Sequence, residues 1–133
     1  MKAQSNSSTK VRRIIAGALA LIMAVVIFAL SAVPGESYPP HPGFLNYLAH
    51  FGEYLVFAAL LTIAFTGGRL KPWQAMLIAI VLASAYAASD ELHQLFVPGR
   101  WSDPVDWATD TLGACLGALI ATLALKQISK RQT

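Results

Sequence analysis

Four long apolar stretches, separated by short polar segments, set the pattern of this chain. Residues 14–33 carry no charged side chain, and twenty helical residues with a rise of ~1.5 Å each match the ~30 Å thickness of a bilayer core. Three further apolar stretches follow, and proline and glycine residues separate them. The pattern predicts an all-α, polytopic membrane protein with four transmembrane helices, at about residues 14–33, 44–66, 72–96 and 104–125.

These helices are expected to form a single domain, residues 14–125, between basic polar tails at 1–13 and 126–133. The first stretch also resembles a secretory signal peptide, because a basic head precedes it and small residues lie near its end. It is longer than the roughly 7 to 15 apolar residues of a typical signal peptide, and further apolar spans follow it. An uncleaved first helix is therefore favoured.

Composition supports a membrane location. Hydrophobic residues make up 56% of the chain and charged residues 13%, whereas a soluble domain has roughly 25% charged residues. The composition argues against a soluble enzyme and against a disordered chain. The few positive charges cannot form the dense basic face that binds nucleic acid, so no nucleic-acid partner is expected. Cys115 is the single cysteine and cannot form an internal disulfide.

The lysine and arginine residues predict the orientation of the helices. Four lie in the N-terminal tail, two in the segment 67–72 and three in the C-terminal tail, and only Arg100 lies on the opposite side. Cytoplasmic loops retain positive charge. The distribution predicts that both termini are cytoplasmic and that the protein is a multi-pass protein of the cytoplasmic membrane.

All seven acidic residues fall on the other side of the predicted membrane. Glu36 lies in the first outer loop, and the remaining six lie at or just inside the outer ends of the second, third and fourth helices. An ionised carboxylate within a bilayer costs ~2.5 to 3.5 kcal/mol on insertion scales, so such side chains face the bundle interior and find partners. These six residues are Glu53, Asp90, Glu91, Asp103, Asp106 and Asp110.

Helical spacing places polar residues on shared faces. His50, Glu53 and Tyr54 follow an i, i+3, i+4 pattern, and Asp90 and Gln94 are four residues apart. Because the polar stripes of three helices lie at the same depth, we expect them to face one another around a polar pocket open to the extracytoplasmic side. The predicted pocket residues are His50, Glu53, Tyr54, Asp90, Glu91, Gln94, Arg100, Asp106 and Asp110.

Some of these residues also have a structural interpretation. Asp103, immediately before Pro104, has the position of an N-cap residue. For Asp106, capping and a role in the pocket are equally open. Asp110 lies a turn too deep for capping, so interhelical bonding or function is favoured.

Other residues of the last three helices are expected to serve packing. Gly113 and Gly117, each followed by alanine, form a ridge of small residues that is typical of close helix contact. His93 is out of phase with Asp90 and is expected on the lipid-headgroup side of its helix. For Tyr54 and Tyr86, hydrogen bonding between helices and a role in the site are equally open.

One segment is similar to a known family. The run from Asp90 to Arg100, DELHQLFVPGR, followed by Asp106 and the segment GACLG at 113–117, closely resembles the VanZ-like family. With His50 and neighbouring residues of the second helix, the resemblance covers roughly residues 44–125. It implies a small bacterial membrane protein of four helices, in a family named for an accessory glycopeptide-resistance protein linked to teicoplanin tolerance. It implies no molecular mechanism.

The chain departs from the pattern of that family at three positions. Asn46 and Tyr47 stand where the family often has an aspartate and a lysine, and Asp110 stands where it commonly has asparagine. The loss of a cation and the gain of an acid predict a more acidic pocket than is usual. The excess of acid can be balanced by Arg100, by histidine, by protonation or by a bound cation.

Two functions from different classes are open. The favoured one is a protein without demonstrable enzymatic activity, whose partners are the lipid bilayer and an envelope lipid or glycopeptide, with a role in envelope physiology or antibiotic resistance. The alternative is a small hydrolase or transferase acting on an envelope lipid, with Glu53, Asp90 and Glu91 as catalytic candidates and possible assistance by a metal. No cofactor is assigned, and the spacing of the ligand residues matches no strong metal motif.

Overall fold

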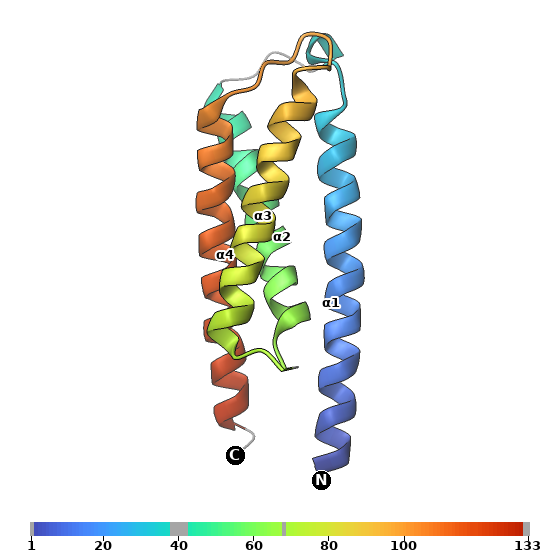
Figure 1. Cartoon of the computed structure of the whole chain (residues 1–133), viewed down its shortest axis with the longest axis vertical. Helices are drawn as coiled ribbons and strands as arrows, with labels where there is room; N and C mark the ends of the chain where they lie inside the picture. Colours follow the sequence, from blue (N-terminus) through green and yellow to red (C-terminus); the bar gives the residue numbers. More distant parts are fainter. Residues whose placement is uncertain (1, 38–42, 68, 132–133) are drawn as a thin grey trace.

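The computed structural model of the chain consists of four long helices joined by short segments (Figure 1). It describes residues 2–37, 43–67 and 69–131, with side chains from residue 7 to residue 130 of these ranges. The helices are α1 (Lys2–Ser31), α2 (Gly43–Phe65), α3 (Pro72–Gln94) and α4 (Pro104–Arg131), and a short 3-10 helix, η1 (Gly35–Ser37), follows α1. The described residues include no strand, so the predicted all-α, four-helix class is confirmed.

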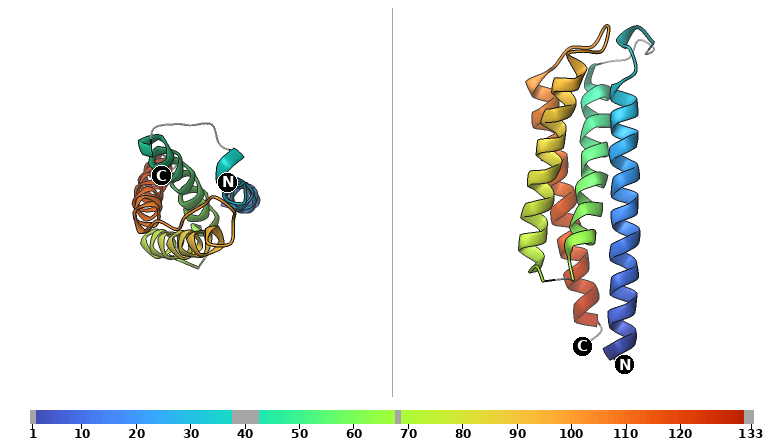
Figure 2. Two further views of the ribbon diagram at one scale, coloured as in Figure 1. Left: turned by 90° about the horizontal axis from the view of Figure 1, so that it is seen from above. Right: turned by 45° about the vertical axis from the view of Figure 1, so that its right-hand side comes forward.

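Helices α2, α3 and α4 form a compact group, and α1 stands beside it. The most extensive contacts join α2 to α4, while α1 mainly contacts α2 and touches α3 little. Figure 2 shows this arrangement from above, with α1 to one side of the other three helices. Both termini lie at the same end of the bundle, together with the segment between α2 and α3 (Figure 1).

All four helices are long and apolar enough to cross a membrane. The candidate spans are Ser7–Ser31, Gly43–Phe65, Pro72–Gln94 and Pro104–Lys130. Large apolar side chains cover the outward faces of all four helices, as expected where lipid replaces water around the protein. The protein is therefore a multi-pass membrane protein, as its sequence predicts.

The predicted helix boundaries differ from the observed ones at several ends. Helices α1 and α4 extend into the basic tails, because residues 2–13 and 126–131 contain neither proline nor glycine to end a helix. The other end of α1 is at Ser31 rather than residue 33, since Pro34 disfavours the helical conformation at the residue before it. Helix α3 ends at Gln94 rather than at residue 96, because its last turn closes with i to i+3 hydrogen bonds.

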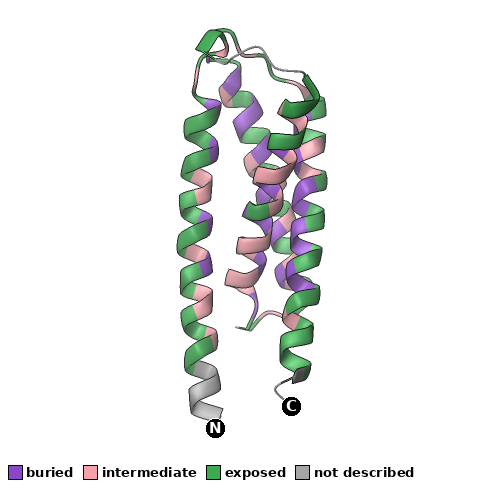
Figure 3. Ribbon diagram, turned by 180° about the vertical axis from the view of Figure 1, so that it is seen from behind, coloured by how far each residue is buried: buried purple, intermediate pink, exposed green. Residues whose placement is uncertain are grey.

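The core consists mostly of small side chains. On α3, Ala75, Ala79, Ala83 and Ala87 are fully buried and recur at every fourth residue. Figure 3 shows that the buried positions form inward stripes on the helices. Small residues let helix backbones approach closely and gain van der Waals contact, which drives helix association in lipid where the hydrophobic effect does not.

The ridge predicted at Gly113 and Gly117 is confirmed as a close contact between α4 and α2. A Cβ atom at Gly113 would overlap the backbone carbonyl of Phe51, and one at Gly117 would overlap that of Leu55. Both glycines are buried. The absence of a side chain at these two positions therefore sets the distance between α2 and α4.

The two loops at the end opposite to the termini are joined to each other. The turn after α3 contains Pro98 and Gly99, where Gly99 has a φ of 70° and the N–H of Arg100 donates to Val97. The N–H of Gly35 donates to the carbonyl of Pro98 at 3.0 Å. These contacts fix the ends of α1 and α3 relative to each other and position Arg100.

Candidate functional site

The predicted pocket residues lie near one another at the end of the bundle away from the termini. They project from α2, α3, α4 and the loop between α3 and α4. We use the name polar end for the part of the bundle that carries His50, Glu53, Tyr54, Asp90, Glu91, Gln94, Arg100, Asp106 and Asp110.

A histidine and an aspartate form the buried centre of the polar end. Asp110 on α4 is fully buried, and Nδ1 of His50 on α2 lies 3.2 Å from its Oδ1 and 3.4 Å from its Oδ2. Whether Nδ1 donates or accepts in this contact depends on the tautomer of the imidazole. This pair links α2 to α4 near Gly113, where the two backbones are close. The interhelical bonding expected of Asp110 is therefore present.

The carboxylate of Glu91 connects α3 to the start of α4. Its Oε2 accepts a hydrogen bond of 2.7 Å from the backbone N–H of Asp103. Asp103 in turn accepts a hydrogen bond of 2.8 Å from the N–H of Val105, so the predicted N-cap role of Asp103 is confirmed. The other oxygen of Glu91, Oε1, is buried and has no hydrogen-bond partner among the described residues.

Asp90, Gln94 and Tyr54 are further residues of the polar end. Nε2 of Gln94 donates to Oδ2 of Asp90 at 3.3 Å, and both side chains are buried. The ring of Tyr54 is fully enclosed, and its hydroxyl finds no partner in the described part of the chain. Tyr86 instead donates a 2.7 Å hydrogen bond to the carbonyl of Ala24 on α1. Of the two tyrosines, Tyr86 therefore bonds between helices.

Two residues of α2 that the pocket prediction omits also bind the acids. Nδ2 of Asn46 lies 3.4 Å from Oδ2 of Asp106, and the hydroxyl of Tyr47 donates to Asp103 at 3.3 Å. Both residues lie about one turn before His50. Their helical spacing from His50 is the sequence signal that identifies them, because residues three or four apart share a helix face.

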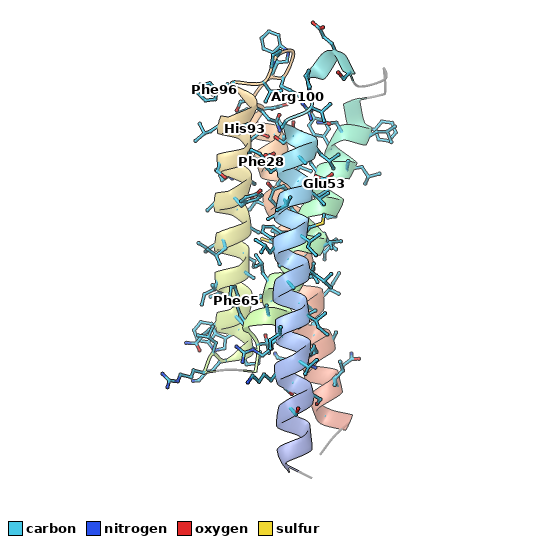
Figure 4. The ribbon with its side chains drawn as sticks, turned by 90° about the vertical axis from the view of Figure 1, so that its right-hand side faces the viewer. Phe28, Glu53, Phe65, His93, Phe96 and Arg100 are labelled. Atoms are coloured by element: carbon cyan, nitrogen blue, oxygen red, sulfur yellow. The ribbon has the colours of Figure 1, made fainter. Side chains whose placement is uncertain are left out.

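A cavity of about 300 Å³ opens at the polar end between α1, α2 and α3. Glu53 lies nearer to Arg100 than to Phe65, which marks the opposite end of α2 (Figure 4). A second hollow of about 310 Å³ adjoins it on the loop side and shares Asn46, Gln94 and Arg100 with it. The lining of the first cavity is Ile27, Leu30, Ser31, Leu45, Asn46, Ala49, His50, Glu53, Asp90, Gln94 and Arg100.

The cavity includes only some of the predicted pocket residues. Glu53 and Asp90, two of the three catalytic candidates, line it, whereas Glu91 lies outside its lining. Tyr54 and Asp110 are buried beside it, and Asp106 lines the second hollow. The structure thus brings these groups together, but only part of them faces the open space.

Helix α1 supplies a wall that the polar pattern did not predict. Ile27, Leu30 and Ser31 line the cavity from α1. The first two are apolar, and an apolar residue on a transmembrane helix gives no sequence signal that separates a cavity wall from a lipid-facing surface. Ser31 is 5% exposed, and its hydroxyl has no partner among the residues that the structure describes.

Arg100 lies at the mouth of the cavity and ties the loop to α1. Its Nε lies 3.3 Å from the carbonyl oxygen of Val33, and its Nη2 lies 3.2 Å from that of Leu30. Cationic side chains stabilise the exposed carbonyls at the end of a helix. Arg100 therefore holds α1 against the polar end as well as offering positive charge to the cavity.

The expectation for His93 is wrong. Its ring stacks on Phe28 of α1, with a centroid distance of 4.6 Å, and its Nε2 is buried. Figure 4 shows the two side chains together below Arg100. His93 lies only three residues after Asp90 on α3, and α1 covers this side of α3 near the loops. The helical periodicity of α3 alone could not predict that α1 packs against this side of it.

The polar end is chemically suited to a cation or to a hydrogen-bond donor. Carboxylates outnumber cationic side chains in it, and carboxylates accept hydrogen bonds and coordinate metal ions. Among the described residues, one group could hold a metal ion, consisting of His50, Glu91 and Asp110. By contrast, an anionic group such as a phosphate would meet Arg100 as the only arginine or lysine of the lining.

Comparison with known proteins identifies a family for this chain and no individual relative. No curated protein and no solved structure is similar to this chain at a significant level. The sequence model of the VanZ/LLP1 family matches residues 4–125, which is nearly the whole chain and covers most of each of the four helices. With its four membrane-spanning helices, the chain belongs to the VanZ/LLP1 family.

Proposed function

We propose that this protein binds an amphiphilic compound of the bacterial cell envelope in the cavity at its polar end. The main support for this proposal is the set of side chains that line the cavity. The lining combines apolar side chains of α1 and α2 with the carboxylates of Glu53 and Asp90. Such a site suits a ligand with an apolar chain and a head group rich in hydrogen-bond donors or amines.

The buried polar groups support binding by this cavity. Ser31 and Gln94 line it, and the hydroxyl of Ser31 lacks a partner among the described side chains and backbone. A buried hydroxyl without a hydrogen bond costs free energy, which a ligand or a water molecule can recover. An envelope lipid and an acylated glycopeptide are both amphiphiles of the required kind. Binding or diverting such a compound is the basis of the proposed role in envelope physiology or glycopeptide resistance.

The proposal requires the polar end to face outward from the cytoplasmic membrane. Positive charge at the end with the termini supports this orientation. In a Cys115→Ser background, we expect a membrane-impermeant thiol reagent to label Glu36→Cys in intact cells. Gln127→Cys is expected to react only after permeabilisation. Labelling of residue 127 in intact cells, with residue 36 protected, would reverse the orientation and reject an outward-facing site.

Filling the cavity is expected to weaken binding. Ala49 lines the cavity, and Ala88 is an exposed alanine on α3 outside its lining. We expect Ala49→Trp to lower the affinity for the bound amphiphile by at least about tenfold, or ~1.4 kcal/mol, because the indole occupies the site. Ala88→Trp adds the same side chain at a lipid-facing position and is expected to bind like the parent protein.

The measurement is native mass spectrometry of the purified chain with envelope lipid extract and, separately, with teicoplanin. Expression in a sensitive bacterium then tests whether teicoplanin susceptibility falls with the parent protein and not with Ala49→Trp. If the correctly inserted parent retains neither lipid nor teicoplanin, the binding proposal fails. If it binds a lipid and leaves susceptibility unchanged, the resistance role alone is rejected.

A second candidate is a hydrolase or transferase acting on an envelope lipid. The observation in its favour is that Glu53 and Asp90 face the same cavity, where one carboxyl group can act as acid and another as base. Conversion of labelled envelope lipids by the parent protein, with loss in Glu53→Gln, would support this candidate. Binding without conversion leaves the binding function as the conclusion.

A further inference from the structure

Three potential metal ligands from three different helices converge beside the cavity. They are His50 of α2, Glu91 of α3 and Asp110 of α4, and each offers one ligand atom within 4.8 Å of the others. Their exposed fractions are 8%, 5% and 0%, so the atoms meet in the interior and not on the surface. One imidazole and two carboxylates form a ligand set that divalent transition-metal ions accept.

A second observation comes from the hydrogen bonds of Glu91. Its Oε2 is held by the N–H of Asp103, while its Oε1 is buried and unpartnered within the described residues. A carboxylate oxygen that has lost water without gaining a donor is costly in the interior of a membrane protein. A cation bound by Oε1 removes this cost. The hydrogen bond from the backbone to Oε2 holds the carboxylate in position to bind the cation.

The balance of charge points to the same conclusion. Six carboxylates belong to the polar end and the adjoining cap, while Arg100 directs two of its nitrogens to the backbone carbonyls of Leu30, in α1, and Val33, just after it. Buried charges of one sign repel one another, and pairing, protonation or metal coordination relieves this repulsion. A divalent cation between His50, Glu91 and Asp110 neutralises two of the acids. These six are Glu53, Asp90, Glu91, Asp103, Asp106 and Asp110.

We propose that His50, Glu91 and Asp110 bind one divalent transition-metal ion, with Zn²⁺ the best match and Mn²⁺ the next. The imidazole disfavours Mg²⁺ and Ca²⁺, which take oxygen ligands, and the absence of sulfur in the ligand set disfavours Cu⁺. Three protein ligands leave a coordination position for water or for a ligand oxygen. His50 also lines the cavity, so that position is next to the proposed amphiphile site. The metal site does not depend on binding of the amphiphile.

The test is metal binding by the intact chain, purified in detergent through a tag without histidine and stripped with a chelator. We expect about one Zn²⁺ per chain by elemental mass spectrometry, and a rise in melting temperature on adding Zn²⁺. Glu91→Gln keeps an oxygen for the N–H of Asp103 but cannot act as an anionic ligand. It is expected to weaken Zn²⁺ binding by more than the roughly 10- to 100-fold that loss of an outer-shell partner costs.

Matched controls use residues of the same type outside the group. His93→Gln is the control for His50→Gln, and Glu36→Gln is the control for Glu91→Gln. Both controls are expected to bind Zn²⁺ like the parent. The proposal is overturned if the parent binds neither Zn²⁺ nor Mn²⁺, if it binds only Mg²⁺ or Ca²⁺, or if the substitutions at His50 and Glu91 leave binding unchanged. Should a substituted chain fail to fold, the titration of the folded parent decides.

Discussion

Replacing Gly117 with alanine is expected to destabilise the bundle by about 3 kcal/mol, at the upper end of the usual cost of overpacking. The added methyl group would overlap the carbonyl of Leu55, which is backbone and cannot move without displacing α2. The contact between α2 and α4 is the most extensive in the protein. The higher helix propensity of alanine returns only about 1 kcal/mol, so the steric term decides the sign.

Gly52→Ala is the matched control for this effect. Gly52 lies within α2, and a Cβ atom there would meet no other group within 4 Å. The same change of residue is therefore expected to leave the bundle unchanged or to stabilise it by up to ~1 kcal/mol. Unfolding in mixed detergent micelles, followed by circular dichroism, measures both variants. Equal stability of Gly117→Ala and Gly52→Ala would show that the backbones of α2 and α4 do not approach closely at Gly117.

Much of the fold follows from local patterns that a single sequence contains. The spans follow from their length and hydropathy, the start of α4 from Asp103 before Pro104, and the turn after α3 from Pro98 and Gly99. The ridge at Gly113 and Gly117 could also be predicted, because close contact between membrane helices needs small residues at regular spacing. Each of these signals lies within one helix or one turn.

The position of α1 relative to the other helices could not be predicted from such local patterns. Its polar residues are few within the span, and its contacts depend on the loops that hold its end, through Gly35 and Arg100. As a result, the apolar wall of the cavity and the contact of Phe28 with His93 were not predicted. The apolar face of a membrane helix has the same sequence pattern whether lipid or protein covers it.

The group of His50, Glu91 and Asp110 illustrates another limit. Known metal motifs have ligands close together in the sequence, whereas these three residues belong to three separate helices. The sequence predicts that each faces the bundle interior, because charge is costly in lipid. Which acids meet, and at what depth, follows from the spacing of the helices, to which Gly113 and Gly117 contribute.

Removing the carboxylate of Asp110 is expected to have the largest effect on stability within the polar end. Asp110 is fully buried, and Nδ1 of His50 lies 3.2 Å from its Oδ1. Asp110→Ala leaves the imidazole without this partner and a space where the carboxylate was. Breaking a buried pair of this kind costs about 3 to 5 kcal/mol. The experiment is done in the presence of a chelator, so that loss of a bound metal does not contribute.

Two further variants separate the contribution of the pair from that of its parts. Asp110→Asn keeps a side chain of the same shape that can accept from or donate to Nδ1 of His50, so its expected cost is only about 1 kcal/mol. The double variant His50→Leu with Asp110→Leu removes both polar groups. It is expected to be more stable than Asp110→Ala, because no polar group is left unpaired. A cost for Asp110→Ala no larger than that for Asp110→Asn would mean that the interaction with His50 does not stabilise the fold. The packing of α2 against α4 would then be what brings the two residues together.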